Sequence, residues 1–255
     1  MSTSSPSHKS RRPPLRCLPQ DAAAIVLRLP HIPVEREIPG SDADRGLDDL
    51  ISKPWGAEFR VYDDALIDVW MLHLRAGTRT SMHCHPRKDT LLLCVSGYGR
   101  VTTGDGRDAP IEPGDIVPIE RGAAHRSTAT TAMTLVEIET PRDKYDLVRL
   151  QDDAGRAGRG YERTRKPHPV RIATAADGPP CARLRPGCAD RSYAFGLEPG
   201  REIRRHLDGL AFAISLDALG VLRREIVIGT PDVLGAISAD HVCLTIRSTH
   251  KEDSP

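Results

Sequence analysis

The middle of the chain repeats one pattern, a short apolar run that ends at glycine, proline or aspartate. Runs of this length, bounded by turn residues, predict β-strands. We expect strands at Phe59–Tyr62, Val69–Leu74, Thr90–Val95, Arg100–Thr103, Ile116–Ile119 and Thr134–Glu139. Many short strands at regular spacing predict an all-β sandwich or barrel.

A polar stretch separates this region from a second one. Residues 152–160 are rich in glycine and charge, and we interpret 141–169 as a solvated linker. A lid over a functional site is the alternative interpretation. The apolar pattern resumes beyond it, and Val242–Ile246 resembles a closing strand.

The second region, residues 170–248, faintly repeats the first. The run Leu197–Gly200 with His206 matches Leu74–Gly77 with His83, at an offset of 123 residues, and the same offset places Gly97 on Gly220. The repeat predicts a second β unit of the same kind that has lost its site. His206, Asp208 and His241 would be what is left of that site, and an unrelated β extension is the alternative.

Both ends of the chain predict tails. Residues 1–20 carry basic but no acidic side chains, lack the apolar core of a secretory signal, and predict a disordered tail. Residues 249–255 are short and polar. The expected organisation is therefore a tail, a first β domain over 21–140, the linker, a second β domain and a final tail.

Composition and charge limit the kinds of partner that we expect. The net charge of the 255 residues is +1, and no apolar run reaches membrane-spanning length. We therefore expect neither nucleic acid nor a membrane as partner, but a small molecule, with a homodimer left open. The cysteines, at 17, 84, 94, 181, 188 and 243, form no CxxC pair. Without an export signal they predict free thiols in the cytoplasm.

Three histidines carry the strongest chemical signal. His83 and His85 are two residues apart, so in a strand their side chains point to the same face. His125 follows forty residues later, at the end of a turn. Three neutral imidazoles make a good site for a divalent transition metal, with open positions for water or substrate.

The spacing of these residues resembles the motifs of the cupin superfamily. Gly77, His83, His85 and Gly97 fit its first motif, and Gly114, Gly122 and His125 fit its second. The run Lys53-Pro54-Trp55-Gly56 looks like the start of the mannose-6-phosphate-isomerase-like branch. The resemblance implies a jelly-roll barrel, and the repeat would make the chain a degenerate bicupin.

The resemblance also implies a metal-binding glutamate, and here the chain departs from the pattern. The glutamate position falls on Thr90, with Asp89 one residue earlier. A one-residue slip in a strand turns a side chain to the opposite face, so Asp89 would need a bulge to reach a metal. His83, His85 and His125 are thus the expected ligands, with Asp89 or Thr90 as a candidate fourth.

Three kinds of function fit such a centre. The first is a metal-dependent isomerase or epimerase acting on a small oxygenated substrate, sugar-derived or a carboxylate. The second is a three-histidine Fe(II) dioxygenase, and the third is a cupin that binds a small molecule without turnover. The metal is Fe, Zn, Mn or Ni. Glu120 and Lys88 are the candidate acid–base residues because they lie near the histidines in sequence.

Overall fold

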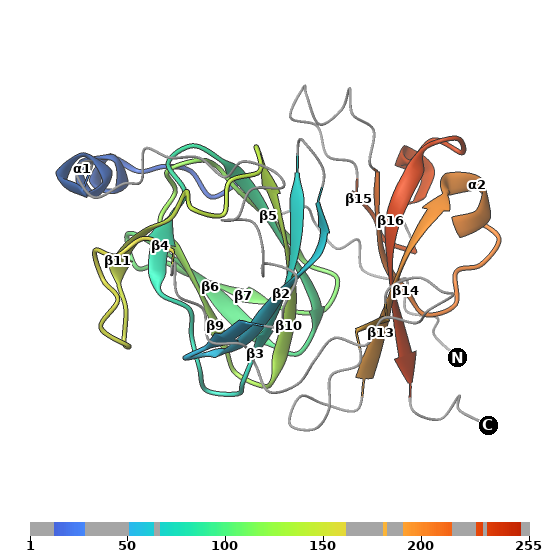
Figure 1. Cartoon of the computed structure of the whole chain (residues 1–255), viewed down its shortest axis with the longest axis horizontal. Coiled ribbons are helices and arrows are strands. Elements are labelled where there is room, and N and C mark those ends of the chain that lie inside the picture. The colour runs from blue at the N-terminus through green and yellow to red at the C-terminus, as the bar shows by residue number, and fades with distance from the viewer. Residues whose placement is uncertain are drawn as a thin grey trace, which may run out of the picture.

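The computed structural model describes residues 13–28, 51–63, 67–161, 181–182, 191–215, 228–231 and 234–250. Most of these residues lie in antiparallel strands, arranged in three sheets (Figure 1). The helices are short: α1 spans Pro19–Arg28, α2 spans Gly200–Ile203, and a 3-10 turn spans Leu234–Ala236. No helix in the described part of the chain is long and apolar enough to cross a membrane.

Two of the sheets face each other and form a barrel. The first has the order β1-β2-β3-β10-β5-β8, with bounds β1 Ile51–Lys53, β2 Gly56–Asp63, β3 Asp68–Leu74, β10 Met133–Thr140, β5 Asp89–Ser96 and β8 Ile116–Ile119. The second has the order β11-β4-β9-β6-β7, with bounds β11 Val148–Gln151, β4 Met82–Cys84, β9 His125–Ala129, β6 Gly99–Thr103 and β7 Asp108–Ile111. Their inner faces share one buried cluster, to which Trp70 and Leu92 come from the first sheet and Val101 and Ile111 from the second.

The first sheet is buried on both faces, which explains its nearly continuous apolar runs. In β10, Leu135 points into the barrel, whereas Val136 and Ile138 point away from it. Glu137 and Glu139 have the same parity as Leu135 and so also point inward. The strand therefore delivers two carboxylates to the barrel interior.

The third sheet covers the outer face of the first. It has the order β12-β13-β16-β14-β15, with bounds β12 Cys181–Ala182, β13 Arg191–Pro199, β16 Val242–His250, β14 Leu210–Ser215 and β15 Ile228–Gly229. Phe212, Ile214 and Ile246 pack in one cluster with Phe59 and Val136 of the barrel. Figure 1 shows this sheet beside β2, β10 and β5.

This packing predicts a large effect of one truncation. Phe212 is 1% exposed at the centre of the contact between the two sheets. We expect Phe212→Ala to lower the free energy of unfolding by about 3–5 kcal/mol, because it removes buried apolar area and leaves a cavity. Urea denaturation followed by tryptophan fluorescence measures the change. Leu207→Ala, at a position 40% exposed, is the matched control and should stay within about 0.5 kcal/mol. Equal effects of the two substitutions would contradict the packing described.

The all-β prediction is confirmed, and a second β unit follows the barrel. The described residues of that unit form one antiparallel sheet rather than a copy of the barrel. Gly200, which the repeat pairs with the positive-φ turn at Gly77, starts helix α2 instead. His206 and Asp208 are exposed, and His241 hydrogen-bonds Ser215 through Nδ1 at 3.0 Å. Gly220 lies outside the described residues.

Two expected boundaries need correction. Residues 141–161, expected as linker, belong to the barrel unit, because β11 pairs with β4 and Asp146 is fully buried. Residues 13–20, expected within the tail, pack on the barrel: the Leu15 amide donates to the Pro118 carbonyl at 2.8 Å. The buried carboxylate of Asp21 then accepts a hydrogen bond from the Ala124 amide at 3.3 Å. Residues 1–12, 162–169 and 251–255 lie outside the described residues.

Candidate metal centre

Two neighbouring strands bring the three histidines together. His83 lies in β4, and its antiparallel partner across the ladder is His125, the first residue of β9. His85 follows β4 directly and has the same parity as His83. The ring centroids of His83 and His125 are 4.3 Å apart, and that of His85 lies 5.1 Å and 5.6 Å from them. The turn before His125 is fixed by Gly122 at φ 77°, whose amide donates to the His85 carbonyl at 2.8 Å.

Backbone carbonyls fix the tautomer of all three rings. Nδ1 of His83 donates to the Ser81 carbonyl at 2.8 Å, Nδ1 of His85 to that of Asp146 at 2.6 Å, and Nδ1 of His125 to that of Ala123 at 3.0 Å. A carbonyl only accepts, so each Nδ1 carries the proton and each Nε2 keeps its lone pair. Hydrogen bonds of this kind, made by the ring nitrogen that faces away from the metal, orient metal-ligating histidines in proteins.

Burial keeps these rings neutral. It lowers the pKa of His125 to about 4. Burial, followed by the neighbouring His125, takes the pKa of His83 well below its ordinary value, and burial with Lys88 does the same for His85. The Nε2 atoms of His85 and His125 are buried and have no hydrogen-bond partner among the described residues. A neutral imidazole with a free lone pair is the form that binds a metal.

A carboxylate completes the group. Glu137 projects from β10 across the barrel, and its oxygen and the three imidazole donors all lie within 4.8 Å of one another. Burial, and then the nearby Glu139, raise the pKa of Glu137 to about 7. Three imidazoles and one carboxylate form a donor set for Zn, Mn, Fe or Ni rather than for Ca or Mg. The residues therefore fit the divalent transition metal that the sequence predicts.

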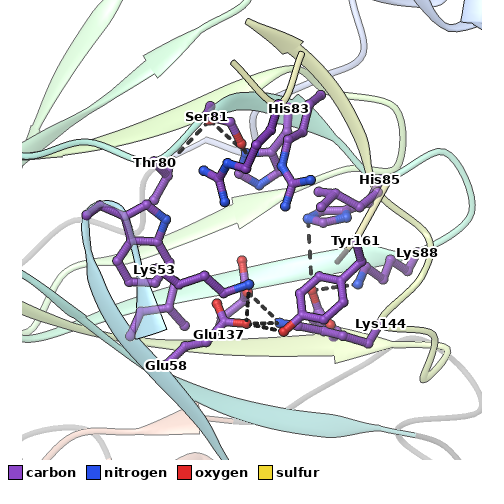
Figure 2. Close-up of a pocket in the computed structure, with 16 residues that line it drawn as sticks. Lys53, Glu58, Thr80, Ser81, His83, His85, Lys88, Glu137, Lys144 and Tyr161 are labelled. Carbon is purple, nitrogen blue, oxygen red and sulfur yellow. Dashed lines mark hydrogen bonds and ion pairs between the residues drawn. The ribbon is translucent and has the colours of Figure 1, made fainter. Parts of the chain in front are cut away.

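A cavity opens beside the histidines and is ringed by buried charges. Its empty space, counted together with the open mouth, is about 470 Å³. Figure 2 shows Lys53, Glu58, Lys144 and Tyr161 on the side opposite His83. Glu58 accepts the Tyr161 hydroxyl at 2.6 Å and lies 3.4 Å from Lys53 Nζ and 3.7 Å from Lys144 Nζ. Lys144 also reaches Glu137 at 3.9 Å, which connects this group to the donor set.

A second buried pair lies next to His85. Lys88 Nζ is 2.6 Å from Glu139, and both side chains are 1% exposed. Burial alone would lower the pKa of Lys88, but Glu139 and Asp68 outweigh it and raise the pKa above its ordinary value. Glu139 also lies 3.9 Å from Nε2 of His85. Asp68, close by, accepts the Trp70 indole at 2.7 Å, and burial followed by Glu139 raises its pKa well above the usual range.

Comparison with known proteins agrees with this geometry. Residues 70–139 match the model of the cupin domain. This part of the chain is a cupin domain. The matched residues include all four members of the donor group. The match does not confirm the predicted mannose-6-phosphate-isomerase-like branch or the predicted second cupin unit.

Individual relatives cover only parts of the chain. A curated (R)-mandelonitrile lyase of Granulicella tundricola is 34% identical over 87 residues, which are 33% of this chain and 66% of that protein, just under two thirds of its length. The solved structure of KdgF from a Halomonas species is 20% identical, with a TM-score of 0.35, over 37% of this chain and 88% of that one. A cupin-superfamily sugar phosphate isomerase from Silicibacter pomeroyi is 19% identical, with a TM-score of 0.33, over 38% and 65% of the two chains.

Within the cupin domain, the predicted fourth-ligand positions lie outside the donor group. Asp89 forms a bidentate contact with Arg121, with Oδ2 2.8 Å from Nη2, and also accepts the Arg121 amide at 2.9 Å. Thr90 is buried with inward parity, opposite Glu139 in the ladder. The carboxylate that reaches the histidines comes instead from a strand about fifty residues later in the chain.

This placement predicts that Asp89 contributes nothing to metal binding. In Asp89→Ala we expect full metal content, because the substitution removes a contact to Arg121 and no donor. Elemental analysis of the untagged protein measures the metal per chain. Glu137→Gln is the comparison, and its affinity should fall by about 10-fold or more, since a neutral amide replaces a charged ligand. Loss of metal in Asp89→Ala, with full content in Glu137→Gln, would reverse the assignment.

The two predicted acid–base residues have different positions. Lys88 lines the cavity. Glu120 is exposed on the outside of the barrel, 3.7 Å from Arg16, and does not line it. Arg79, Arg87 and Arg121 form ion pairs with Asp153, Asp143 and Asp89 respectively, away from the cavity lining.

Sequence reasoning missed several residues of the site. Glu137 and Glu139 alternate with apolar residues in a buried strand. Because buried carboxylates are usually paired or bind a metal, their presence in such a strand could have indicated the site. Lys53, Glu58, Lys144 and Tyr161 come from distant segments and had no shared pattern. In the described part of the chain, Cys17, Cys84, Cys94 and Cys243 are free thiols.

Proposed function

We propose that this cupin is a divalent-metal enzyme that holds its metal with His83, His85 and His125. Glu137 would supply the carboxylate donor. The substrate would be a small oxygenated molecule, sugar-derived or a carboxylate, and the reaction an isomerase-type proton transfer. The observation that carries the proposal is the convergence of three lone-pair Nε2 atoms beside a ring of buried acid–base groups.

When bound, a divalent metal would act as a Lewis acid on a carbonyl or hydroxyl oxygen of the substrate. The chain's own residues then handle the proton. Glu58 lies between two ammonium groups and accepts the Tyr161 hydroxyl, so this pair can take a proton from a substrate carbon or hydroxyl and return it. Lys144, protonated because Glu58 and other carboxylates outweigh the effect of burial, can hold an oxyanion.

The buried acid–base pairs of the cavity and their shifted pKa values support a proton-transfer enzyme over a cupin that only binds a small molecule. A purely binding cupin has no need for buried acid–base pairs, which are costly to keep in a low-dielectric interior. Perturbed titratable groups gathered in a cavity are typical of catalytic sites. The curated relative named as a lyase, 34% identical over 87 residues, supports an enzyme over a purely binding protein.

The second candidate is a three-histidine Fe(II) dioxygenase. It is favoured by the neutrality of the three imidazoles, which leaves the metal its charge and open positions. A dioxygenase consumes O2, whereas an isomerase or lyase does not. A measurement of O2 consumption therefore distinguishes the dioxygenase from the isomerase.

The test uses untagged full-length protein reconstituted separately with Mn, Fe, Zn and Ni. A panel of hydroxy-aldehydes, hydroxy-acids and cyanohydrins is incubated in D2O, with deuterium incorporation followed by NMR and O2 followed by an electrode. We expect deuterium incorporation without O2 uptake. Tyr161→Phe should lower the rate by about 100-fold or more, as expected for loss of a general acid–base group. Arg100→Gln, exposed on β6, is the control and should keep full activity. O2 uptake coupled to substrate loss would replace this proposal with the dioxygenase.

A further inference from the structure

The cavity beside the histidines carries more cations than carboxylates. Its lining includes Lys53, Lys88, Lys144, Arg149 and Arg156 against Glu58, Glu137 and Glu139. A metal held by neutral imidazoles would add its own positive charge. Because charges interact more strongly where water is excluded, this balance favours an anionic ligand over a neutral one.

Two of the ammonium groups are held at fixed positions on one wall. Lys53 and Lys144 have side chains only 4% and 6% exposed, and both face Glu58. Lys53 Nζ lies 4.2 Å from the centre of the Tyr161 ring, and Lys144 Nζ lies 3.7 Å from that of Trp70. Cation–π contacts of this kind restrain an ammonium group without neutralising it. The wall therefore presents two positioned charges and the Tyr161 hydroxyl to the cavity (Figure 2).

The cations favour a carboxylate over a phosphate. Arginine forks and backbone amides at helix ends are common phosphate ligands, and lysine binds phosphate as a point charge. Here Arg156 forms a bidentate contact with Asp152, at 2.7 Å and 3.1 Å, and Arg149 donates to the Arg159 carbonyl at 3.3 Å. With Glu58 between them, Lys53 and Lys144 contribute one net positive charge, which matches a carboxylate more closely than a phosphate dianion.

We propose that the site takes a small hydroxy or oxo acid, with its carboxylate against Lys53 and Lys144 and its hydroxyl or carbonyl oxygen toward the histidine centre. This inference rests on the proposed function, since it names the substrate class of the same site. It further implies that Lys53 and Lys144 determine specificity rather than metal binding.

The test compares three small probes on the Co(II)-loaded full-length protein: glycolate, the neutral isostere glycolamide, and inorganic phosphate. Calorimetry measures the affinity of each. We expect glycolate to bind at least about 10-fold more tightly than glycolamide, as for hydrogen bonds to charged groups. Lys144→Met should remove most of this preference while glycolamide still binds. The Co(II) content of each variant is measured alongside, because Lys144 lies 3.9 Å from Glu137. Lys53→Gln is the second variant in case Lys144→Met fails to fold, and Arg100→Gln is the control that should keep the preference.

The outcomes separate this inference from the metal proposal. A glycolate preference that persists in the metal-free protein and disappears in Lys144→Met supports the carboxylate wall even if no metal enzyme is found. Equal affinity for glycolate and glycolamide overturns the inference, and so does a preference that both lysine variants retain. Phosphate binding more tightly than glycolate overturns the carboxylate assignment in favour of a phosphorylated substrate.

Discussion

Replacing Lys88 with methionine is expected to lower the free energy of unfolding by about 3–5 kcal/mol, the cost of leaving one member of a buried ion pair without its partner. Lys88 and Glu139 are 2.6 Å apart inside the barrel, each with a side chain 1% exposed. Lys88 also donates to the Asp143 carbonyl at 3.0 Å, so the substitution removes the ammonium group paired with Glu139 together with a hydrogen bond. Chemical denaturation measures the change.

The double variant Lys88→Met/Glu139→Gln tests the reason for this loss. With both members of the pair neutral, neither is left as an unpaired buried charge, and most of the lost stability should return. The exposed pair Arg100–Asp108 supplies the matched control. Arg100→Met should change stability by less than about 1 kcal/mol, as is usual for surface ion pairs. A double variant as unstable as Lys88→Met would show that packing, and not the uncompensated charge, sets the cost.

Replacing His85 with alanine is expected to weaken metal binding by more than about 100-fold, because partners that merely orient a metal-ligating histidine are already worth 10–100-fold. His85 is 5% exposed, and its Nδ1 is held by the Asp146 carbonyl, so alanine removes an imidazole that is already oriented for binding. Competition with a chelating dye gives the affinity for Zn or Co. Elemental analysis gives the occupancy after purification.

Histidines outside the group are the control for this experiment. His206 is exposed and belongs to the proposed remnant of a second site. His206→Ala should leave metal content and affinity unchanged. Full occupancy in His85→Ala, or a loss of metal in His206→Ala, would show that the ion binds elsewhere.

The barrel could be predicted from the sequence because parity and turn residues carry most of the information about short strands. Each predicted strand between residues 59 and 139 overlaps a strand of the structure, and the positive-φ turns at Gly97 and Gly114 lie where the pattern places them. The third sheet was predicted as a second, degenerate cupin-like unit, whereas its described residues form a single sheet. The sequence of these strands does not show whether they form a separate barrel or pack on the first one. In the structure, Phe212 is buried in one cluster with Phe59, so the sheet packs on the first barrel.

The site was predictable only where its residues are close in sequence or follow a motif. His83 and His85 share a strand face, and the second motif brings His125 beside them. Glu137 lies across the barrel, so its position depends on strand order rather than on spacing. Glu120 shows the opposite error: it is five residues from His125, but the turn at Gly122 intervenes, and its side chain lies outside the barrel beside Arg16.

Anomalous diffraction from a crystal of the metal-loaded protein, recorded at the absorption edge of the metal, tests the proposed metal centre. We expect one strong peak per chain, about 2.0–2.2 Å from the Nε2 atoms of His83, His85 and His125, with a Glu137 oxygen as a further neighbour. A peak bound through the Nδ1 atoms, or one away from these three histidines, would contradict it.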